Sequence, residues 1–412
     1  MSERVVITGM GAVSPLGLSA EESWQNALAG VSGIGLITQF DTSDFLVKVA
    51  GEVKNFDPTN YMSARDARRQ DRFEQFAVAA AKEAVEQAGL AATEINSERV
   101  GVIISSAIGG LGSLEEGSRT LIESGPRRVS PFLIPMLMPN GGAGLTGIEY
   151  GFQGPAFSVA SACASGADGI GVAWMMLKLG MIDVAVTGAS ESTIAPVGVA
   201  AFDRLGAMSR RTIGEMTPQP FDKARDGLVM GEGAAVLVME RESHARKRGA
   251  QIFAEFGGYG STSDAYHITA PAADGAGGAR AMRLALESAG VNPDEISYIS
   301  AHGTATPLND AAETQAIKAA FGDLAYNIPV SSTKSMTGHM MGATGALEAL
   351  FCVRAVSENV LPPTINYHTP DLECDLDYIP NQARETPVEI AISNAFGFGG
   401  HNAVLLIKKY RA

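Results

Sequence analysis

Short runs of apolar, mostly β-branched residues recur along the chain and alternate with alanine-rich stretches of helical periodicity. The apolar runs show no polar alternation, which is typical of strands buried on both faces. The strand-like runs lie at residues 4–8, 100–104, 183–187, 234–239 and 389–393. The clearest helices are expected at residues 76–88 and 279–289, each followed by a glycine that would end it. This alternation predicts an α/β fold with buried sheets.

The second part of the chain repeats the pattern of the first part in three places. The matching pairs are residues 84–107 (AVEQAGL, then VGVIISSA) with 285–303 (ALESAGV, then ISYISAHG), CASGADGIG from Cys163 with HMMGATGAL from His339, and DVAVTGAS from residue 183 with EIAISNAF from residue 389. Three pairs of similar segments in the same order predict that the chain consists of two duplicated α/β halves. We place these halves at residues 1–250 and 251–412.

If the two halves share one fold about a pseudo-twofold axis, Cys163 and His339 begin equivalent helices whose N-termini face one cleft. The first half is longer than the second, so its extra residues should form loops or caps that carry specificity or dimer contacts. These insertions are expected near residues 40–70, 110–150 and 195–225.

Composition narrows the class of protein without identifying it. Of 412 residues, 46% are hydrophobic and 18% are charged, which is enough for a large buried core. The 31 basic and 45 acidic residues give a net charge of −14, which disfavours a general nucleic-acid binder but leaves room for a local basic patch. Three cysteines are too few for a disulfide framework, and no apolar run reaches the ~18 residues of a membrane span. With no signal-peptide pattern at the N-terminus, we expect a cytoplasmic protein without membrane insertion.

Cys163 is the first candidate for chemistry. It lies in SACASG, after a strand-like run at residues 156–160 and before a helix expected to extend to about Lys178. A thiol at a strand-to-helix turn meets the positive end of the helix dipole, which predicts a lowered pKa and thiolate character. Small neighbours leave space for a bulky acyl group. The alternative is a buried structural cysteine, which is how we interpret Cys352 and Cys374.

Two histidines occupy similar contexts. His302 lies in AHGTATP at the end of a strand-like run, and His339 lies in SSTKSMTGHM, both among small hydroxyl residues. A pair at matching topological positions, with a cysteine at a third, is less easily explained as structural than a single histidine. The same trio could bind zinc in principle, but neither a CxxC nor an HxxxH spacing supports a metal site.

Lys334 and Glu348 flank His339 along the chain. Glu348 falls in the apolar helix GALEALF, where a carboxylate needs a partner, and Lys334 is the nearest basic residue. We favour a structural ion pair that positions the site over direct proton chemistry by these residues.

A glycine-rich stretch, NAFGFGGHN, occupies residues 394–402 after a strand-like run. Its glycines permit positive φ angles, so successive backbone N–H groups could point into a cleft. Together with the N–H of Cys163 they could form an oxyanion hole. A tight turn without chemistry is the alternative, and the stretch lacks the lysine and following helix of a phosphate loop.

Arginines cluster at near-helical spacing in SARDARRQDR, and a further pair stands at Arg127 and Arg128. In a protein of net negative charge, such clusters could steer an acidic partner. A solvated helix face explains them equally well.

Four ordered motifs resemble those of the β-ketoacyl-acyl carrier protein synthases, which are condensing enzymes of the thiolase-like fold. They are SACASG at Cys163, AHGTATP at His302, SSTKSMTGHMMGATGALEA through His339, and NAFGFGGHN at Phe398. The resemblance covers essentially the whole chain, and its details look like the elongating synthase II type of bacterial type II fatty acid synthesis. It implies an α/β, thiolase-like fold with duplicated βαβαβαββ halves in a five-layered αβαβα arrangement, a homodimer and no cofactor.

The resemblance also implies a role for each matching residue. Cys163 would be the nucleophile, and His302 and His339 would complete a Cys-His-His triad. The other implied roles are support of the site by Lys334, Glu348 and Asp310; an oxyanion hole and gate at Cys163, Phe398, Phe396 and Gly399; pantetheine contacts at Thr269, Thr304 and Thr306; an acyl pocket at Ile108 and Phe202; and a carrier-protein patch at Arg65, Arg68, Arg69, Arg127 and Arg128. Acyl carrier proteins are acidic, so a local basic patch would reconcile such a partner with the net charge of this chain.

The implied reaction is a decarboxylative Claisen condensation. Cys163 would take an acyl chain from acyl carrier protein, and the two histidines would stabilise the enolate formed as malonyl-acyl carrier protein loses CO₂. One alternative is a discrete polyketide ketosynthase. A second is a non-catalytic partner resembling the chain-length factors, against which the presence of Cys163 argues. A third is a Cys-His hydrolase, which would release free acid.

The sequence departs from the family pattern at several positions. Ala305 stands where serine is usual, and Ser300 stands where many members have asparagine near a monovalent-cation site. Ala107 replaces a common glycine before Ile108, which would trim the acyl pocket. Residues 203–217 also diverge from the usual pattern.

Overall fold

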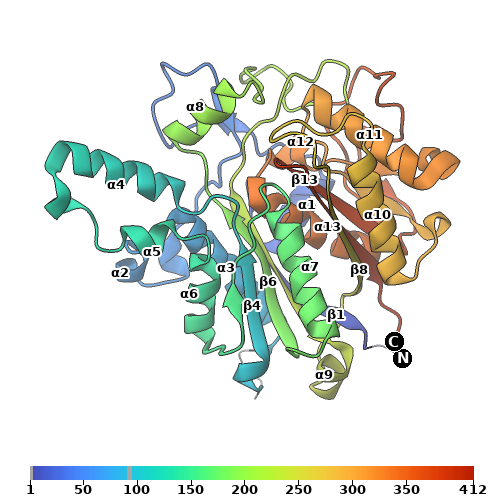
Figure 1. Ribbon diagram of the computed structural model, residues 1–412, viewed down its shortest axis with the longest axis horizontal. Coiled ribbons are helices and arrows are strands. Elements are labelled where there is room, and N and C mark those ends of the chain that lie inside the picture. The colour runs from blue at the N-terminus through green and yellow to red at the C-terminus, as the bar shows by residue number, and fades with distance from the viewer. Residues whose placement is uncertain (1–2, 91–94) are drawn as a thin grey trace.

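The apolar runs form one ten-stranded sheet in the computed structural model, which describes residues 3–90 and 95–412 (Figure 1). The strand order is β10-β9-β13-β14-β8-β1-β7-β6-β4-β5. Its strands are β1 (Val5–Val13), β4 (Val100–Ser105), β5 (Ala156–Phe157), β6 (Val184–Glu191), β7 (Gly233–Arg241), β8 (Ala254–Ser263), β9 (Tyr298–Ser300), β10 (Val330–Ser331), β13 (Ile390–Gly397) and β14 (His401–Lys409). The run expected at residues 156–160 is a shorter strand than predicted.

Two small ribbons lie outside this sheet. They pair β2 (Gly35–Leu36) with β3 (Val49–Ala50), and β11 (Val360–Leu361) with β12 (Arg384–Glu385).

The strand order repeats within the sheet. In chain order β1, β4, β5, β6 and β7 correspond to β8, β9, β10, β13 and β14, and numbering each set from one to five gives the spatial order 3-2-4-5-1 in both. The two sets meet where β1 pairs antiparallel with β8, at Val5 with Phe256 and Ile7 with Ala254. This repeat supports the division of the chain after residue 250, which remains our proposal.

Helices cover the outer faces of the sheet, and a central pair of helices packs against strands of both halves. The central pair is α7 (Ser165–Lys178) and α13 (Thr344–Glu358), the first half is covered by α3 (Arg72–Gln87) and α6 (Gly141–Tyr150), and the second half is covered by α10 (Ala276–Ala289) and α11 (Pro307–Phe321). Alternate side chains of one strand enter different cores, since Leu237 packs with α7 and α13 while Val236 and Val238 pack with α3. This confirms the expected five-layered αβαβα arrangement.

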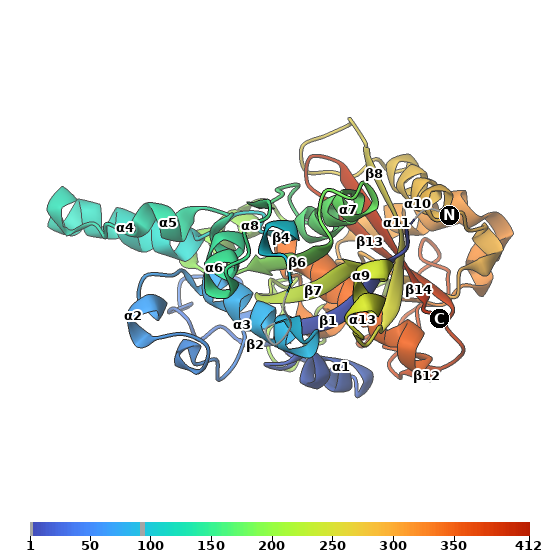
Figure 2. The same ribbon diagram turned by 90° about the horizontal axis from the view of Figure 1, so that it is seen from below.

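The helices outside the main cores lie partly in the regions expected to be insertions of the first half, near residues 40–70, 110–150 and 195–225. The remaining helices are α1 (Ala20–Leu28), α2 (Ala64–Ala67), α4 (Leu111–Ser124), α5 (Leu133–Leu137), α8 (Pro196–Arg204), α9 (Glu242–Lys247) and α12 (Lys334–Thr337), with single 3₁₀ turns such as η4 (Pro126–Arg128) and η7 (Met341–Ala343). Helices α4 and α5 project from the body as an arm (Figures 1 and 2). None of the helices in the described part of the chain is long and apolar enough to cross a membrane.

Candidate active site

A single cavity of about 350 Å³ gathers residues from both halves of the chain. Cys163 reaches it from the turn before α7, His302 from the segment after β9, and His339 from the segment between α12 and η7. Of the other residues singled out in the sequence, the cavity is also lined by Phe202, Thr269, Thr304, Thr306, Phe396 and Phe398. The structure therefore brings the proposed nucleophile, both histidines and the proposed pantetheine contacts together.

The turn that presents Cys163 has an unusual backbone. Ala162 has a φ of 52°, in the left-handed region that residues with a side chain rarely adopt. The loop that carries Phe398 packs directly against this turn, because a Cβ atom added at Gly397 would lie 2.8 Å from the carbonyl oxygen of Ser161 and 3.1 Å from the backbone nitrogen of Cys163. The glycine thus allows the Phe398 backbone to reach the thiol.

The Cys163 thiol is buried, and its pKa differs from the sequence-based expectation. Burial raises the pKa of Cys163 to about 11, whereas we predicted a lowered value from the helix dipole. That prediction is wrong because the loss of solvent around the sulfur outweighs the favourable groups near it. Those groups are the backbone N–H of Phe398, the charge of Lys334 and the N–H of Cys163 itself, all of which lower the pKa. The two N–H groups thus lie close to the sulfur.

The two imidazole rings lie against each other edge to face, with ring centroids 5.3 Å apart and an interplanar angle of 87°. The His339 backbone is fixed by its N–H, which donates to Val229 at 2.7 Å, and its Nδ1 lies 3.1 Å from the Thr344 hydroxyl. Within the described residues, His302 Nδ1 and His339 Nε2 are buried without a hydrogen-bond partner.

Both histidines are neutral at pH 7. Burial, followed by the positive charge of Lys334, lowers the pKa of His302 and of His339 well below the ordinary value. A neutral imidazole carries one N–H and can donate a hydrogen bond without bringing a positive charge into the cavity.

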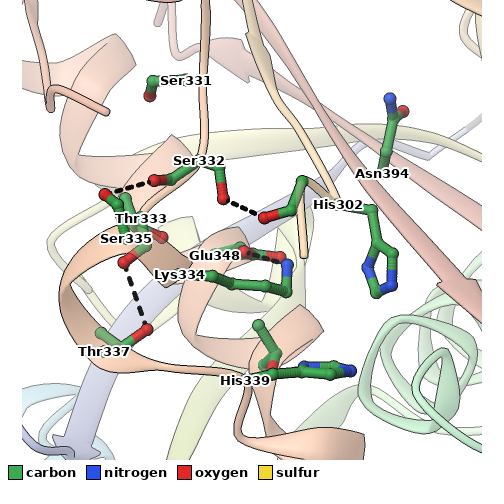
Figure 3. Close-up of polar contacts among 12 residues, drawn as sticks. His302, Ser331, Ser332, Thr333, Lys334, Ser335, Thr337, His339, Glu348 and Asn394 are labelled. Carbon is green, nitrogen blue, oxygen red and sulfur yellow. Dashed lines mark hydrogen bonds and ion pairs between the residues drawn. The ribbon is translucent and has the colours of Figure 1, made fainter. Parts of the chain in front are cut away.

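Lys334 and Glu348 form a buried ion pair behind the histidines (Figure 3). Lys334 Nζ donates to Glu348 Oε1 at 2.6 Å, and each side chain is only 1% exposed. Burial raises the pKa of Glu348 to about 7, although the adjacent lysine opposes this rise. Neither residue lines the cavity, so the pair acts on the site through the field of Lys334 and through packing.

Glu313 on α11 belongs to the site and was missed in the sequence. Its carboxylate accepts the backbone N–H groups of His302 and Gly303, each at 2.7 Å, and a bond from the Asn394 amide at 3.0 Å. It therefore fixes the segment that carries His302. Helix α11 also carries Asp310, Thr314 and Lys318, so the isolated-carboxylate signal that singled out Glu348 was absent for Glu313.

The proposed gate residue Phe398 closes one side of the cavity. Its ring stacks on that of Phe202, with centroids 6.1 Å apart and an interplanar angle of 20°. The next residue, Gly399, has a φ of 86° and donates its N–H to the carbonyl of Ile268 at 2.7 Å. The loop of residues 397–400, which carries Phe398, is thus hydrogen-bonded to the segment that carries Thr269, one of the residues lining the cavity.

Several residues from the sequence analysis lie outside the cavity. Those not among its lining residues are Ile108, Lys334, Glu348, Asp310, Gly399, Arg65, Arg68, Arg69, Arg127 and Arg128. Asp310 is buried on α11 and accepts the backbone N–H of Phe221 at 2.8 Å. The Arg69 guanidinium lies over the Phe132 ring at 4.5 Å, which joins the region of α2 to the arm.

A monovalent cation, which the family resemblance raises at Ser300, can be tested against the oxygen atoms nearby. Ser300 pairs with Ser393 across β9 and β13, and in the described part of the chain Ser393 Oγ, Asn394 Oδ1 and Glu348 Oε2 are buried without hydrogen-bond partners. Unpaired buried oxygens are suitable ligands for a hard cation. Among the residues that the structure describes, however, no group of three or more His, Cys, Asp or Glu side chains is arranged to hold a metal ion.

Comparisons with known proteins agree with one another. Residues 2–245 match the family described as "Beta-ketoacyl synthase, N-terminal domain", and residues 253–368 match "Beta-ketoacyl synthase, C-terminal domain". The chain is 48% identical over 411 residues to "3-oxoacyl-[acyl-carrier-protein] synthase 2" of Staphylococcus aureus (strain COL), covering 100% of this chain and 99% of that protein. It is 48% identical over 410 residues to the protein of the same name from Synechocystis sp., covering 99% of each.

Solved structures show the same fold. A "Beta-ketoacyl synthase from Burkholderia phymatum STM815" superposes with a TM-score of 0.91 at 37% identity, covering 99% of this chain and 100% of that one. A structure described as "type II PKS acyl-carrier protein in complex with its ketosynthase bound to the hexaketide" gives a TM-score of 0.92 at 35% identity, with 100% of both chains covered.

Proposed function

The chain belongs to the β-ketoacyl synthase family, and from this premise we propose that it is an acyltransferase of the elongating type II class. It condenses an enzyme-bound acyl chain with malonyl-acyl carrier protein and lengthens fatty acids by two carbons. The observation that carries this proposal is the meeting of Cys163, His302 and His339, which are distant in sequence, in one cavity.

The first half-reaction transfers the acyl chain to Cys163. The sulfur attacks the thioester carbonyl carbon, the new C–S bond forms, and the bond to the pantetheine sulfur breaks. The proton of the Cys163 thiol ends on the released pantetheine thiol. The N–H groups of Cys163 and Phe398, which lie close to the sulfur, stabilise the negative charge that develops on the carbonyl oxygen.

The second half-reaction uses the neutral histidines. Malonyl-acyl carrier protein loses its carboxylate as CO₂, and the electron pair of the broken C–C bond forms an enolate whose oxygen accepts hydrogen bonds from His302 and His339. The enolate carbon attacks the acyl carbonyl, the bond to the Cys163 sulfur breaks with its electron pair left on sulfur, and the thiolate takes a proton from water to regenerate the thiol. Because burial and the Lys334 charge hold both imidazoles neutral, each ring donates a hydrogen bond from its N–H without carrying a positive charge.

Identity separates this proposal from the polyketide alternative. The chain is 48% identical to proteins named 3-oxoacyl-[acyl-carrier-protein] synthase 2, against 35% for the solved ketosynthase of a type II polyketide system. Cys163 in the cavity argues against a non-catalytic partner of the chain-length-factor kind.

The decisive experiment follows labelled malonyl groups from malonyl-acyl carrier protein into product. The wild-type protein is expected to form a labelled β-ketoacyl thioester two carbons longer than the primer, and Cys163→Ala is expected to abolish it. Cys374→Ala is the matched control, because Cys374 is buried away from the cavity and should leave the rate unchanged. Release of free acid without a new carbon–carbon bond would instead identify a hydrolase.

Acyl carrier protein is the expected partner, and the proposed docking patch is basic and accessible. Arg65, Arg68, Arg127 and Arg128 are exposed and form no ion pair with other residues that the structure describes. Charge reversal at Arg65 and Arg68 is expected to raise KM for acyl carrier protein, with a smaller effect at high salt and an unchanged turnover at saturation. An unchanged KM would remove these residues from the patch.

The homodimer of the proposal is supported by surfaces that one chain leaves uncovered. Strand β5 is at the edge of the sheet, and no residue of α4 or α5 is buried. The arm exposes Ile122 by 84% and Ile134 by 62%. A second copy is the occupant that would cover these apolar groups. Light scattering should give twice the mass of one chain, and Ile134→Asp should shift it toward the monomer, whereas a monomeric wild-type protein would refute the dimer.

A further inference from the structure

Glu191, the last residue of β6, is a completely buried carboxylate beside the active site that sequence reasoning did not single out. Its Oε1 accepts bonds from the Ser106 hydroxyl at 2.7 Å and the Ile108 N–H at 3.3 Å. Its Oε2 accepts the N–H of Ala107 at 2.8 Å and the N–H of Gly342 at 3.1 Å. One side chain therefore accepts hydrogen bonds from four donors.

These donors belong to two different segments of the site. Residues 106–108 follow β4 in the first half and carry Ile108, while Gly342 lies in η7, three residues after His339 in the second half. The two segments touch each other, since a Cβ atom added at Gly342 would lie 2.8 Å from the Ala107 nitrogen and 2.7 Å from Glu191 Oε2. Glu191 thus links residues 106–108, here called the Ile108 segment, to residues 339–342, here called the His339 turn.

Glu191 also acts on the nucleophile through its charge. Its negative charge raises the pKa of Cys163, which places the carboxylate within electrostatic reach of the sulfur. Burial raises the pKa of Glu191 to about 6 against the pull of its four hydrogen bonds, so the group is ionised at neutral pH. Glu191 therefore has two effects that can be measured separately. The length of its side chain lets it bond both segments, and its charge raises the pKa of Cys163.

Resting on the proposed function, we infer that Glu191 is a positioning residue that fixes Ile108 relative to the His339 turn and thereby sets which acyl chains the enzyme accepts. The family resemblance assigns Ile108 to the acyl pocket, and its N–H is one of the four groups that Glu191 binds. With Ile108 at the acyl pocket, a shift of its segment changes which acyl chains fit.

Two variants at this position separate the effect of side-chain length from the effect of charge. Glu191→Asp keeps the charge but is one methylene shorter, so it cannot bond both segments at once. Glu191→Gln keeps the length but loses the charge, and its amide nitrogen turns a donor toward backbone N–H groups. The kcat/KM ratio for long over short acyl-carrier primers is expected to change about tenfold in both, which is the discrimination that one methylene supplies in an apolar pocket.

The titration of Cys163 supplies the readout that a merely structural role would not move. Alkylation by iodoacetamide as a function of pH should follow the wild type in Glu191→Asp and shift to lower pH in Glu191→Gln. The control is Glu83→Gln, because Glu83 on α3 also accepts backbone N–H groups from two segments, at Ala12 and Ala20, each at 2.9 Å, but lies away from the cavity. It should alter neither the acyl preference nor the titration.

Ser106→Ala removes the hydroxyl that donates to Glu191 and accepts the Gly109 N–H at 2.9 Å, and it leaves the three backbone bonds of Glu191, so it should shift acyl preference in the same direction by a smaller factor. An acyl preference in Glu191→Asp and Ser106→Ala equal to that of the wild type would overturn the inference. A wild-type protein that forms no β-ketoacyl product would instead refute the proposed function, so the two failures are distinguishable.

Discussion

Adding a single methyl group at Gly397 tests the oxyanion hole. Gly397 ends β13, and no positive φ angle is required there, so alanine can adopt the backbone conformation. Its Cβ atom would lie 2.8 Å from the Ser161 carbonyl oxygen, closer than real Cβ atoms approach, and 3.1 Å from the Cys163 nitrogen, which is a tight contact. Because both neighbours are backbone atoms, the loop bearing Phe398 must move outward by a few tenths of an ångström.

The size of the effect follows from the donor that moves. Deleting one oxyanion-hole donor in an enzyme typically lowers the rate by ~10²–10³, or about 2.7–4 kcal/mol of transition-state stabilisation. In Gly397→Ala the Phe398 N–H is displaced rather than deleted, so we expect a loss near the lower end, about 10²-fold. Substrate binding by residues at the cavity mouth should change much less, which places the loss in turnover rather than in KM.

Single-turnover transfer of an acyl group to Cys163, followed by mass spectrometry of the intact protein, measures this step directly. The matched control is Gly144→Ala in α6, where no atom would lie within 4 Å of the new Cβ atom. That variant should acylate at the wild-type rate and be more stable by about 0.5–1 kcal/mol, as for glycine to alanine within a helix. Wild-type acylation by Gly397→Ala would show that the Phe398 N–H does not stabilise the oxyanion.

Three further predictions concern the buried ionisable groups. Lys334→Met should lower the free energy of unfolding by about 3–5 kcal/mol, measured by urea titration, because it leaves the Glu348 carboxylate buried without its partner; a loss below about 1 kcal/mol would contradict this. Since the folded pKa values of His302 and His339 lie below those of the unfolded chain, the unfolded state binds more protons below pH ~6.5. The free energy of unfolding should therefore fall by about 1.4 kcal/mol per pH unit for each histidine as the pH decreases, and glutamine at either position should remove that part of the slope; an unchanged slope would refute it. Alkylation of Cys163 should rise about tenfold per pH unit from pH 7 toward its pKa of about 11, whereas a plateau near pH 8 would show a lowered pKa.

The fold could be predicted largely because its signals are local. Buried β-branched runs, alanine-rich helices and closing glycines are short-range features. The three internal repeats pair the Cys163 segment, directly before α7, with the His339 segment, which the turn η7 separates from α13. The expected cleft between the two halves is the cavity that both residues line.

The parts that could not be predicted depend on distant partners. The pKa of Cys163 is set by the balance between burial and nearby dipoles, and burial depends on packing that no window of sequence reveals. Glu313 and Glu191 are bonded mainly to backbone N–H groups, which every residue type carries, so the sequence gives no sign of which segments they bind. Ile108 was expected to line the acyl pocket, but it is not among the residues that line the cavity of this single chain.

The position of β1 constrains how this chain can be made. Val5 is synthesised early, yet it pairs with Arg241 of β7 and with Phe256 of β8. More than half of the 412 residues must therefore leave the ribosome before the first strand can meet its neighbours. Until then an apolar strand has both edges open, which makes the nascent chain a substrate for chaperones and a hazard for aggregation.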